Sequence, residues 1–257
     1  MRAALLLAAT LLAATMPLHA QSTGTAALAD SARVSIEAAV DRGDLPALDA
    51  SIAFIDRALA LHAGDPLLRH YRGYALYRAG TLAMGQHGVA RARPYLDRAS
   101  ETLEPLAEGA TIPETYALLS SVYGLQIATS RVSMIAGMRL GPKATEQMSR
   151  AVEAGPRNPR VWVLRGISAF NTPSAFGGGI DKAEAYLKKA LELSATDSPA
   201  APLPAWGRAD VHVWLGQLYA KQGKRDAARA EYRAALALQP GHPWITQVLL
   251  PQLDRTD

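Results

Sequence analysis

The feature that most constrains the fold of this chain is a pattern of small side chains, clearest in the segment Ala209–Pro240. Gly216 and Ala228 flank a turn at Gly223, and each has large apolar neighbours at helical spacing. Those neighbours are Leu215, Tyr219 and Tyr232. The spacing predicts two antiparallel helices that cross closely where the small residues meet, with the large side chains around the crossing. Pro240 is then expected to end the second helix.

This unit resembles the tetratricopeptide repeat, a helix–turn–helix unit of about 34 residues, with His212 where the family usually has Trp. The pattern recurs upstream, with small residues at Gly73, Ser120 and Gly166 in the first helices. The alanines that close the second helices are Ala58, Ala99, Ala151, Ala190 and Ala235. Their spacing exceeds the family's repeat length, which predicts insertions between or within the helix pairs.

The resemblance implies an all-α fold, a right-handed superhelical α-solenoid of antiparallel helix pairs. The expected units are residues 26–65, 66–105, 113–158, 159–195 and 209–240, followed by a capping helix at 243–253. Trp244, Val248 and Leu249 are expected to cover the last pair.

The N-terminus predicts a secretory signal peptide over residues 1–20, because Arg2 precedes an uncharged apolar run that ends near Ala20. A retained anchor is the alternative, although the run is too short to span a bilayer. We therefore expect a mature chain of residues 21–257 that is periplasmic or secreted. The absence of Cys excludes disulfides, thiolate metal sites and a thiol nucleophile. The net charge of +4 comes without clustered basic and aromatic residues, which argues against nucleic-acid binding.

No catalytic motif occurs in the sequence, and the histidines of the mature chain are scattered singly. We therefore expect a protein that is not an enzyme and holds no cofactor or metal. Met134, Met138 and Met148 are expected to fill the core of an irregular helix, with a soft copper site as the less favoured alternative.

A glycine-rich turn, Phe176-Gly177-Gly178-Gly179, replaces the short turn of the fourth unit. Its amides at a helix N-terminus would suit an anion. The favoured alternative is structural: Asp181 caps the helix and the glycines permit a tight reversal. A P-x-x-F/Y-G-G segment here also resembles the periplasmic T component of tripartite (TRAP-type) transporters, over this unit alone.

Two further segments interrupt the units. Leu125–Pro142 either folds over one end of the groove as a lid or lengthens two helices, and the sequence leaves both open. Ser194–Arg208 contains three prolines and predicts an extended connector, which Trp206 is expected to pin to the solenoid.

The first helices of a solenoid line its concave face. Counting from the small residues, this face predicts a partner-binding set of aromatic, cationic and amide side chains: Tyr74, Tyr77, Arg78, Arg160, Phe170, Asn171 and Lys221. Such a surface suits an extended peptide or acidic segment through stacking and charge-assisted hydrogen bonds. We expect a non-catalytic scaffold that binds a protein or peptide partner of the cell envelope. The alternative is a periplasmic small-ligand carrier or accessory subunit of a transporter, with the glycine turn and Leu125–Pro142 enclosing its pocket.

Overall fold

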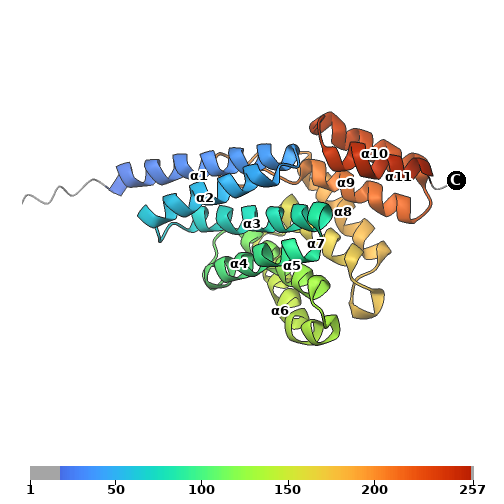
Figure 1. Cartoon of the computed structure of the whole chain (residues 1–257), viewed down its shortest axis with the longest axis horizontal. Helices are drawn as coiled ribbons and strands as arrows, with labels where there is room; N and C mark the ends of the chain where they lie inside the picture. The colour runs from blue at the N-terminus through green and yellow to red at the C-terminus, as the bar shows by residue number, and fades with distance from the viewer. Residues whose placement is uncertain (1–17, 256–257) are drawn as a thin grey trace, which may run out of the picture.

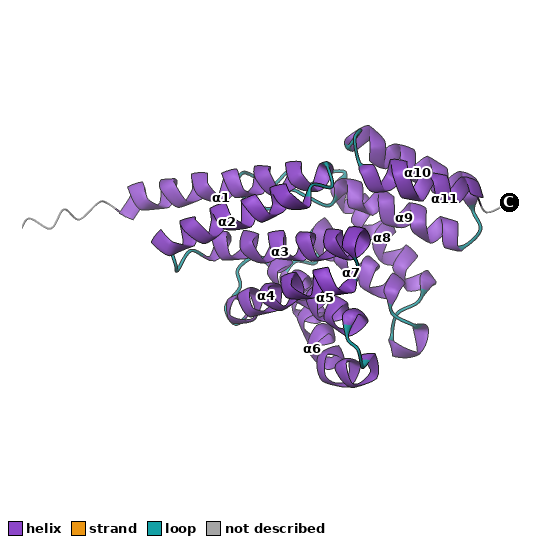
Figure 2. Cartoon of the chain, viewed as in Figure 1, coloured by secondary structure: helices purple, strands orange, loops and turns teal. Residues whose placement is uncertain are grey.

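The computed structural model describes residues 18–255, and within them every regular element is helical (Figure 2). Residues 1–17, which hold most of the expected signal peptide, lie outside the described part, and Leu18–Ala20 belong to the first helix. The α-helices are α1 (Leu18–Asp41), α2 (Leu45–Leu61), α3 (Pro66–His87), α4 (Val89–Ala107), α5 (Pro113–Thr129), α6 (Ser133–Ala154), α7 (Pro159–Asn171), α8 (Ile180–Ser194), α9 (Arg208–Lys221), α10 (Arg225–Leu238) and α11 (Leu250–Arg255). No helix within this range has the length and hydropathy to cross a bilayer.

Consecutive helices pack as antiparallel pairs that follow one another along the molecule, so the all-α solenoid expected from the repeats is confirmed (Figure 1). Local signals set the start of several helices. Asp65 caps α3 by accepting from the amides of Leu67 and Leu68, and Asn158 caps α7 through the amide of Arg160. Proline occupies the first helical position of α3, α5 and α7, where no amide is needed.

The small residues lie where the paired helices touch. A Cβ on Gly166 would lie 2.6 Å from Leu187 Cγ, and one on Gly216 would lie 2.4 Å from Tyr232 Cε1. In the third pair, the Ser120 hydroxyl donates to the carbonyl of Ala144, 2.8 Å away. The inference that these slots must be small is therefore confirmed.

In the second pair, the glycine that lies opposite Leu96 is not the one expected from the sequence. Gly80, not Gly73, faces Leu96 of the partner helix, at 2.8 Å from a built Cβ. Gly73 faces Leu103 instead, at 2.4 Å. The pair α3 and α4 is longer than the last pair, so its helices approach closely at two places and the sequence pattern alone did not distinguish them.

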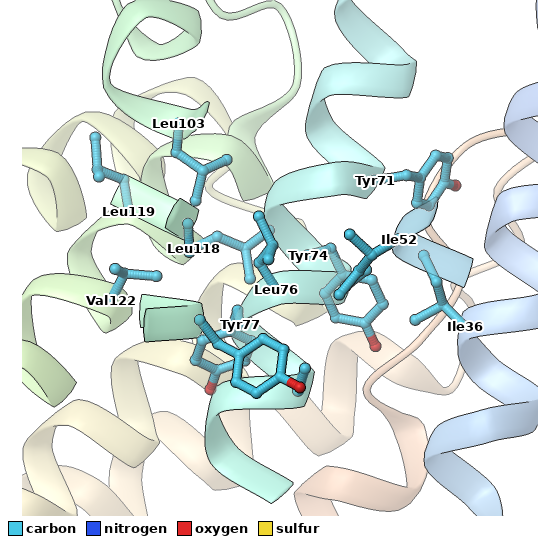
Figure 3. Packing of buried hydrophobic residues seen from close by; sticks show 14 of the residues in the cluster. Ile36, Ile52, Tyr71, Tyr74, Leu76, Tyr77, Leu103, Leu118, Leu119 and Val122 are labelled. Carbon is cyan, nitrogen blue, oxygen red and sulfur yellow. The ribbon is translucent and has the colours of Figure 1, made fainter. Parts of the chain in front are cut away.

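The core is continuous through the first three pairs, and α3 lies at its centre. Figure 3 shows Tyr71 and Tyr74 on the side of α3 that faces Ile36 and Ile52, whereas Leu76 points toward Leu118 on the other side. All these side chains are buried. Helix α3 thus joins the first pair to the third and fixes the side chains near which the connector passes.

The end of the chain covers the last pair differently from expectation. A π-helical turn, η2 (Ile245–Leu249), precedes α11, and the side chains that pack on the last pair are Ile245, Leu249 and Leu253. Of the residues expected in this role, Leu249 is buried there and Val248 is exposed, whereas Trp244 is 38% exposed and contacts Trp214 of α9. The buried residues recur every fourth position, which places them on one side of the closing segment.

The segment Leu125–Pro142 lengthens two helices and forms no lid. Helix α5 runs to Thr129 and α6 begins at Ser133, so a short turn at residues 130–132 joins them. Met148 is buried in the core, but Met134 and Met138 are exposed, which corrects the expectation that all three fill the core.

Candidate partner-binding surface

The first helices of the last four pairs present equivalent positions six residues before each small slot, which in α3 is Gly80. We call these positions the inner face, and they are Tyr74, Glu114, Arg160 and Asp210. In the sequence they look unrelated, because one is aromatic, two are acidic and one is basic. In the structure they join into one network that crosses the repeats.

Arg160 is the centre of this network. It is 5% exposed, and its Nε donates to Oε1 of the buried Glu114 at 2.5 Å. Its Nη1 donates to Oδ2 of Asp197 in the connector, also at 2.5 Å. Burial alone would lower the pKa of Arg160, but the Asp197 hydrogen bond and the Glu114 charge outweigh it and raise the pKa. The guanidinium therefore stays charged and holds two carboxylates from different parts of the chain.

A second ion pair links the repeats further along the inner face. Arg78 Nη1 donates to Asp210 Oδ1 at 3.1 Å, and the Arg78 guanidinium lies 5.9 Å from the centre of the Tyr74 ring. Arg78 and Asp210 are far apart in sequence, so this pair ties α3 to α9 directly. Removing either partner leaves the other charge half-buried without its counter-ion.

The connector, residues 195–207, lies across the inner face. Besides Asp197 on Arg160, the Tyr71 hydroxyl donates to the carbonyl of Pro202. Trp206 is buried and stacks on Tyr74 with ring centres 5.0 Å apart and planes 13° apart. The expectation that Trp206 pins the connector is confirmed. An extended, proline-rich segment therefore already occupies this part of the surface.

The first and last pairs also meet near the connector. Gln239 Nε2 donates to Asp41 Oδ1 at 2.6 Å, and a Cβ on Gly43 would lie 3.2 Å from Pro243 Cγ. Between them lies a cavity of about 180 Å³, whose lining includes Glu37, Asp41, Tyr74, Arg78, Trp206 and Asp210. Burial raises the pKa of both Glu37 and Asp41. Contact between the first and last pairs thus encloses part of the inner face.

The structure separates the predicted site residues into groups. Tyr74 (1% exposed), Arg78 and Arg160 lie beneath or beside the connector, and Tyr77 is buried in the core. Tyr77 was expected on the concave face by counting from Gly73. Because Gly80 is the equivalent glycine in α3, that count was displaced, and Tyr77 lies in the core instead. Asn171 is exposed, and its amide donates to the Ile167 carbonyl of its own helix at 2.9 Å.

Phe170 and Lys221 belong to a second group, which the connector leaves uncovered. Phe170 packs edge-on against Trp214 at 5.5 Å, and Trp214 packs edge-on against Trp244 at 6.2 Å. The ammonium of Lys221 lies 4.9 Å from the centre of the Phe170 ring. We call Phe170, Trp214, Trp244 and Lys221 the aromatic cluster.

Sequence reasoning missed the two tryptophans of this cluster. The sequence analysis gave Trp214 no role and expected Trp244 in the closing contact of the last pair. Gln217 lies one turn beyond Trp214, and within the described residues its buried Nε2 has no hydrogen-bond partner. The helical spacing of Trp214, Gln217 and Lys221 was the available signal, since residues three and four apart share one side of a helix.

The glycine-rich turn has no free amides for an anion. The amides of Gly177, Gly178 and Gly179 donate to the carbonyls of Ser174, Pro173 and Ala169. Gly177 and Gly179 have φ values of +88° and +111°, and a Cβ on Gly178 would lie 2.0 Å from the Thr172 carbonyl oxygen. Glycine is therefore required for the reversal itself. Asp181 was expected to cap α8, but this prediction is wrong. Helix α8 begins at Ile180, and Gly179 holds the cap position.

The described residues contain no group of three His, Cys, Asp or Glu side chains placed to share a metal ion. The buried His70 lies under the inner face, where its Nδ1 is 2.9 Å from the Thr115 hydroxyl. Burial lowers the pKa of His70 to about 4. Its ring is therefore neutral near pH 7, and it is part of the core between α3 and α5.

Comparison with known proteins supports this architecture. The family described as Tetratricopeptide repeat matches residues 209–242. No curated protein shows significant sequence similarity to the chain. A thermophilic TPR protein of Thermus thermophilus is similar in structure, with a TM-score of 0.58 and 23% identity over 86% of this chain and 98% of that one.

The HusA haemophore from Porphyromonas gingivalis also has a TM-score of 0.58, with 22% identity over 78% of this chain and 96% of that one. At these identities the two likenesses establish the fold alone.

Proposed function

We propose that this chain, whose residues 209–242 match the tetratricopeptide repeat and whose fold resembles that of a TPR protein, is an exported scaffold that binds an extended segment of a protein partner in the cell envelope and catalyses no reaction. The repeat fold by itself suggests a protein-interaction scaffold. The proposal adds the place, which is the inner face with the adjoining aromatic cluster. It also adds the compartment, which rests on the signal peptide expected from residues 1–20.

The observation that carries the proposal is the way the connector lies on the inner face. It supplies a carboxylate to Arg160, a main-chain carbonyl to Tyr71 and an aromatic ring to Tyr74. These are the kinds of contact by which solenoid surfaces hold extended peptides: a charge-assisted hydrogen bond, a main-chain hydrogen bond and stacking. The surface is thus chemically suited to an extended, proline-containing segment with an acidic residue.

The aromatic cluster is the part of this surface that the chain leaves accessible. Its rings offer faces for stacking, and Lys221 offers a cation. An acidic or proline-containing segment of a partner would find here the stacking and the cationic contact that the connector makes further along. Tryptophan side chains and aromatic–cation pairs are also common among the residues that contribute most of the binding energy at protein interfaces.

A peptide made from the connector tests whether the inner face binds extended segments. The full chain is prepared with residues 196–206 replaced by Gly and Ser at equal length. Binding of a labelled peptide of residues 195–207 is then measured by fluorescence anisotropy. We expect binding to the replaced chain and little to the native chain, whose own connector occupies the surface. Asp197→Asn in the peptide should weaken binding about tenfold or more, because the charge on Arg160 loses its partner.

Absence of binding to a replaced chain that keeps its native helical circular dichroism would contradict the proposal. If the replaced chain does not fold, the full chain with Asp197→Asn and Trp206→Ala releases the connector without shortening it and serves in its place. For the accessible part, Lys221→Glu is expected to reduce capture of envelope proteins. Arg57→Glu, an equal charge change at an exposed position on α2, should leave capture unchanged.

The alternative, a carrier of organic acids, finds less support in the geometry. The cavity between the first and last pairs is lined by three carboxyl groups, of Glu37, Asp41 and Asp210, against the two guanidinium groups of Arg78 and Arg208, so it offers an anionic ligand no excess of positive charge. The haemophore with the same fold shows that a ligand carrier can be built on such helix pairs, and this keeps the alternative open to test. A thermal-shift screen with organic acids should therefore give no shift.

A further inference from the structure

The tip of the α5–α6 hairpin exposes an unusual amount of apolar surface. Val132, Met134, Ile135 and Met138 are 52%, 75%, 63% and 76% exposed. Twelve large apolar side chains are exposed in the described part of the chain, and four of them fall within these seven residues. Isolated exposed apolar residues are ordinary, but a contiguous group marks a contact surface.

This surface is held on a rigid support. Helix α6 buries Leu140 and Met148 on the side that faces the rest of the hairpin, and a Cβ on Gly137 would lie 3.9 Å from Ile127 of α5. Met138 is two residues from Leu140, which places them on nearly opposite sides of the helix. Met134 lies one turn before Met138 on the same outward side. The methionines therefore point away from the protein because the other side of α6 is already packed.

The charges around the tip all have one sign. Arg131, Arg139 and Lys143 lie among or just beyond the exposed apolar residues and are themselves exposed. No Asp or Glu occurs anywhere from Thr115 to Thr145. Within the described residues, none of these three cations forms an ion pair. The tip is thus apolar and cationic, with no acidic residue in its own segment.

We propose that this tip, residues 131–143, docks on an anionic lipid surface. Met134, Ile135 and Met138 enter the boundary between headgroups and acyl chains, and Arg131, Arg139 and Lys143 contact the lipid phosphates. Apolar side chains combined with cations are the chemistry of interfacial membrane contacts. The shape agrees, since a projecting tip enters a bilayer surface directly but would need a matching hollow in a protein partner. In Figure 1 the α5–α6 and α7–α8 turns project from the same edge, and the latter carries Phe176, 81% exposed.

The absence of Cys allows a site-specific test in the full chain. Met138→Cys is labelled with an environment-sensitive fluorophore, and vesicles of phosphatidylcholine with about one third phosphatidylglycerol are added. The emission should shift to the blue and rise at least about twofold as the probe leaves water. The same label at Leu61→Cys, an exposed position on α2, should not respond. This comparison separates insertion of the tip from any membrane binding by the N-terminal apolar run.

The charge requirement is tested with matched variants. Arg131→Gln with Arg139→Gln should weaken vesicle binding about 30-fold, since each cation near an anionic surface contributes about 1 kcal/mol. Arg57→Gln with Arg157→Gln removes the same charge at exposed positions elsewhere and should leave the probe response intact. No response of the label at position 138 to anionic vesicles, or an equal response to phosphatidylcholine alone, would overturn the proposal. A blue shift that grows with protein concentration without vesicles would also overturn it and assign the tip to a second copy of the chain.

Discussion

Replacing Gly216 by alanine tests the close helix crossing on which the whole fold depends. The added Cβ would lie 2.4 Å from Cε1 and 2.5 Å from Cδ1 of Tyr232, well inside the contact distance of two carbon atoms. The Tyr232 ring is buried and packed in the last core cluster, so it has little room to move aside. The helices must then separate or the ring must leave its rotamer.

The size of the effect follows from two opposing contributions. Overpacking of this kind costs about 1–3 kcal/mol. Alanine in a helix interior recovers about 1 kcal/mol relative to glycine. We therefore expect Gly216→Ala to lower the free energy of unfolding by up to roughly 2 kcal/mol.

The chain provides a matched control in Gly124, a helix-interior glycine of α5 with open space around its Cβ position. Gly124→Ala should stabilise by about 0.5–1 kcal/mol. Urea denaturation followed by circular dichroism measures both variants. In the double variant Gly216→Ala with Tyr232→Leu, the loss should be at least about 1 kcal/mol smaller than the sum of the single losses. If the two alanine variants prove equally stable, the close crossing is not what requires glycine at position 216.

Three further predictions concern the inner face. Because burial lowers the pKa of His70 to about 4, the unfolded chain binds a proton at higher pH than the folded one, and stability should fall by about 2 kcal/mol from pH 7 to pH 5. His70→Gln should flatten the dependence of the urea midpoint on pH in this range, and an unchanged slope would refute the assignment. Arg160→Met leaves Glu114 buried without its partner and should lower the free energy of unfolding by about 3–5 kcal/mol, measured in urea. The further change Glu114→Gln should restore part of that loss, and no recovery would contradict the pairing. Trp206→Ala removes the stack on Tyr74 and should speed tryptic cleavage after Arg208 by about tenfold or more, since local opening governs proteolysis; cleavage at the native rate would show that the stack does not hold the connector.

The helices and their pairing could be predicted from the sequence because they depend on short-range patterns. Gly166 specifies a close crossing with Leu187, 21 residues further along the chain, and Gly216 one with Tyr232, 16 residues further along. The register of the second pair was missed for the same reason, because Gly73 and Gly80 both meet the local requirement. Packing against Leu96 or Leu103 distinguishes them only in three dimensions.

The candidate site was predicted less completely. Arg78 and Arg160 were identified as inner-face cations, but their partners Asp210 and Glu114 lie in other repeats. The exposed methionines at the α6 tip were expected in the core, since helical spacing shows which residues share a side but not whether that side is covered. That depends on which helices lie next to it.

The sequence by itself determined that this protein folds as successive helix pairs, because small side chains must recur wherever two helices touch. Only the tertiary structure decided how the connector lies and where the first and last pairs meet. The connector contains no periodicity, and its position comes from contacts such as Tyr71 with Pro202, which are separated by 131 residues. Contacts of that range depend on the whole arrangement of repeats, and so the covered inner face, the accessible aromatic cluster and the projecting tip became visible only in the folded chain.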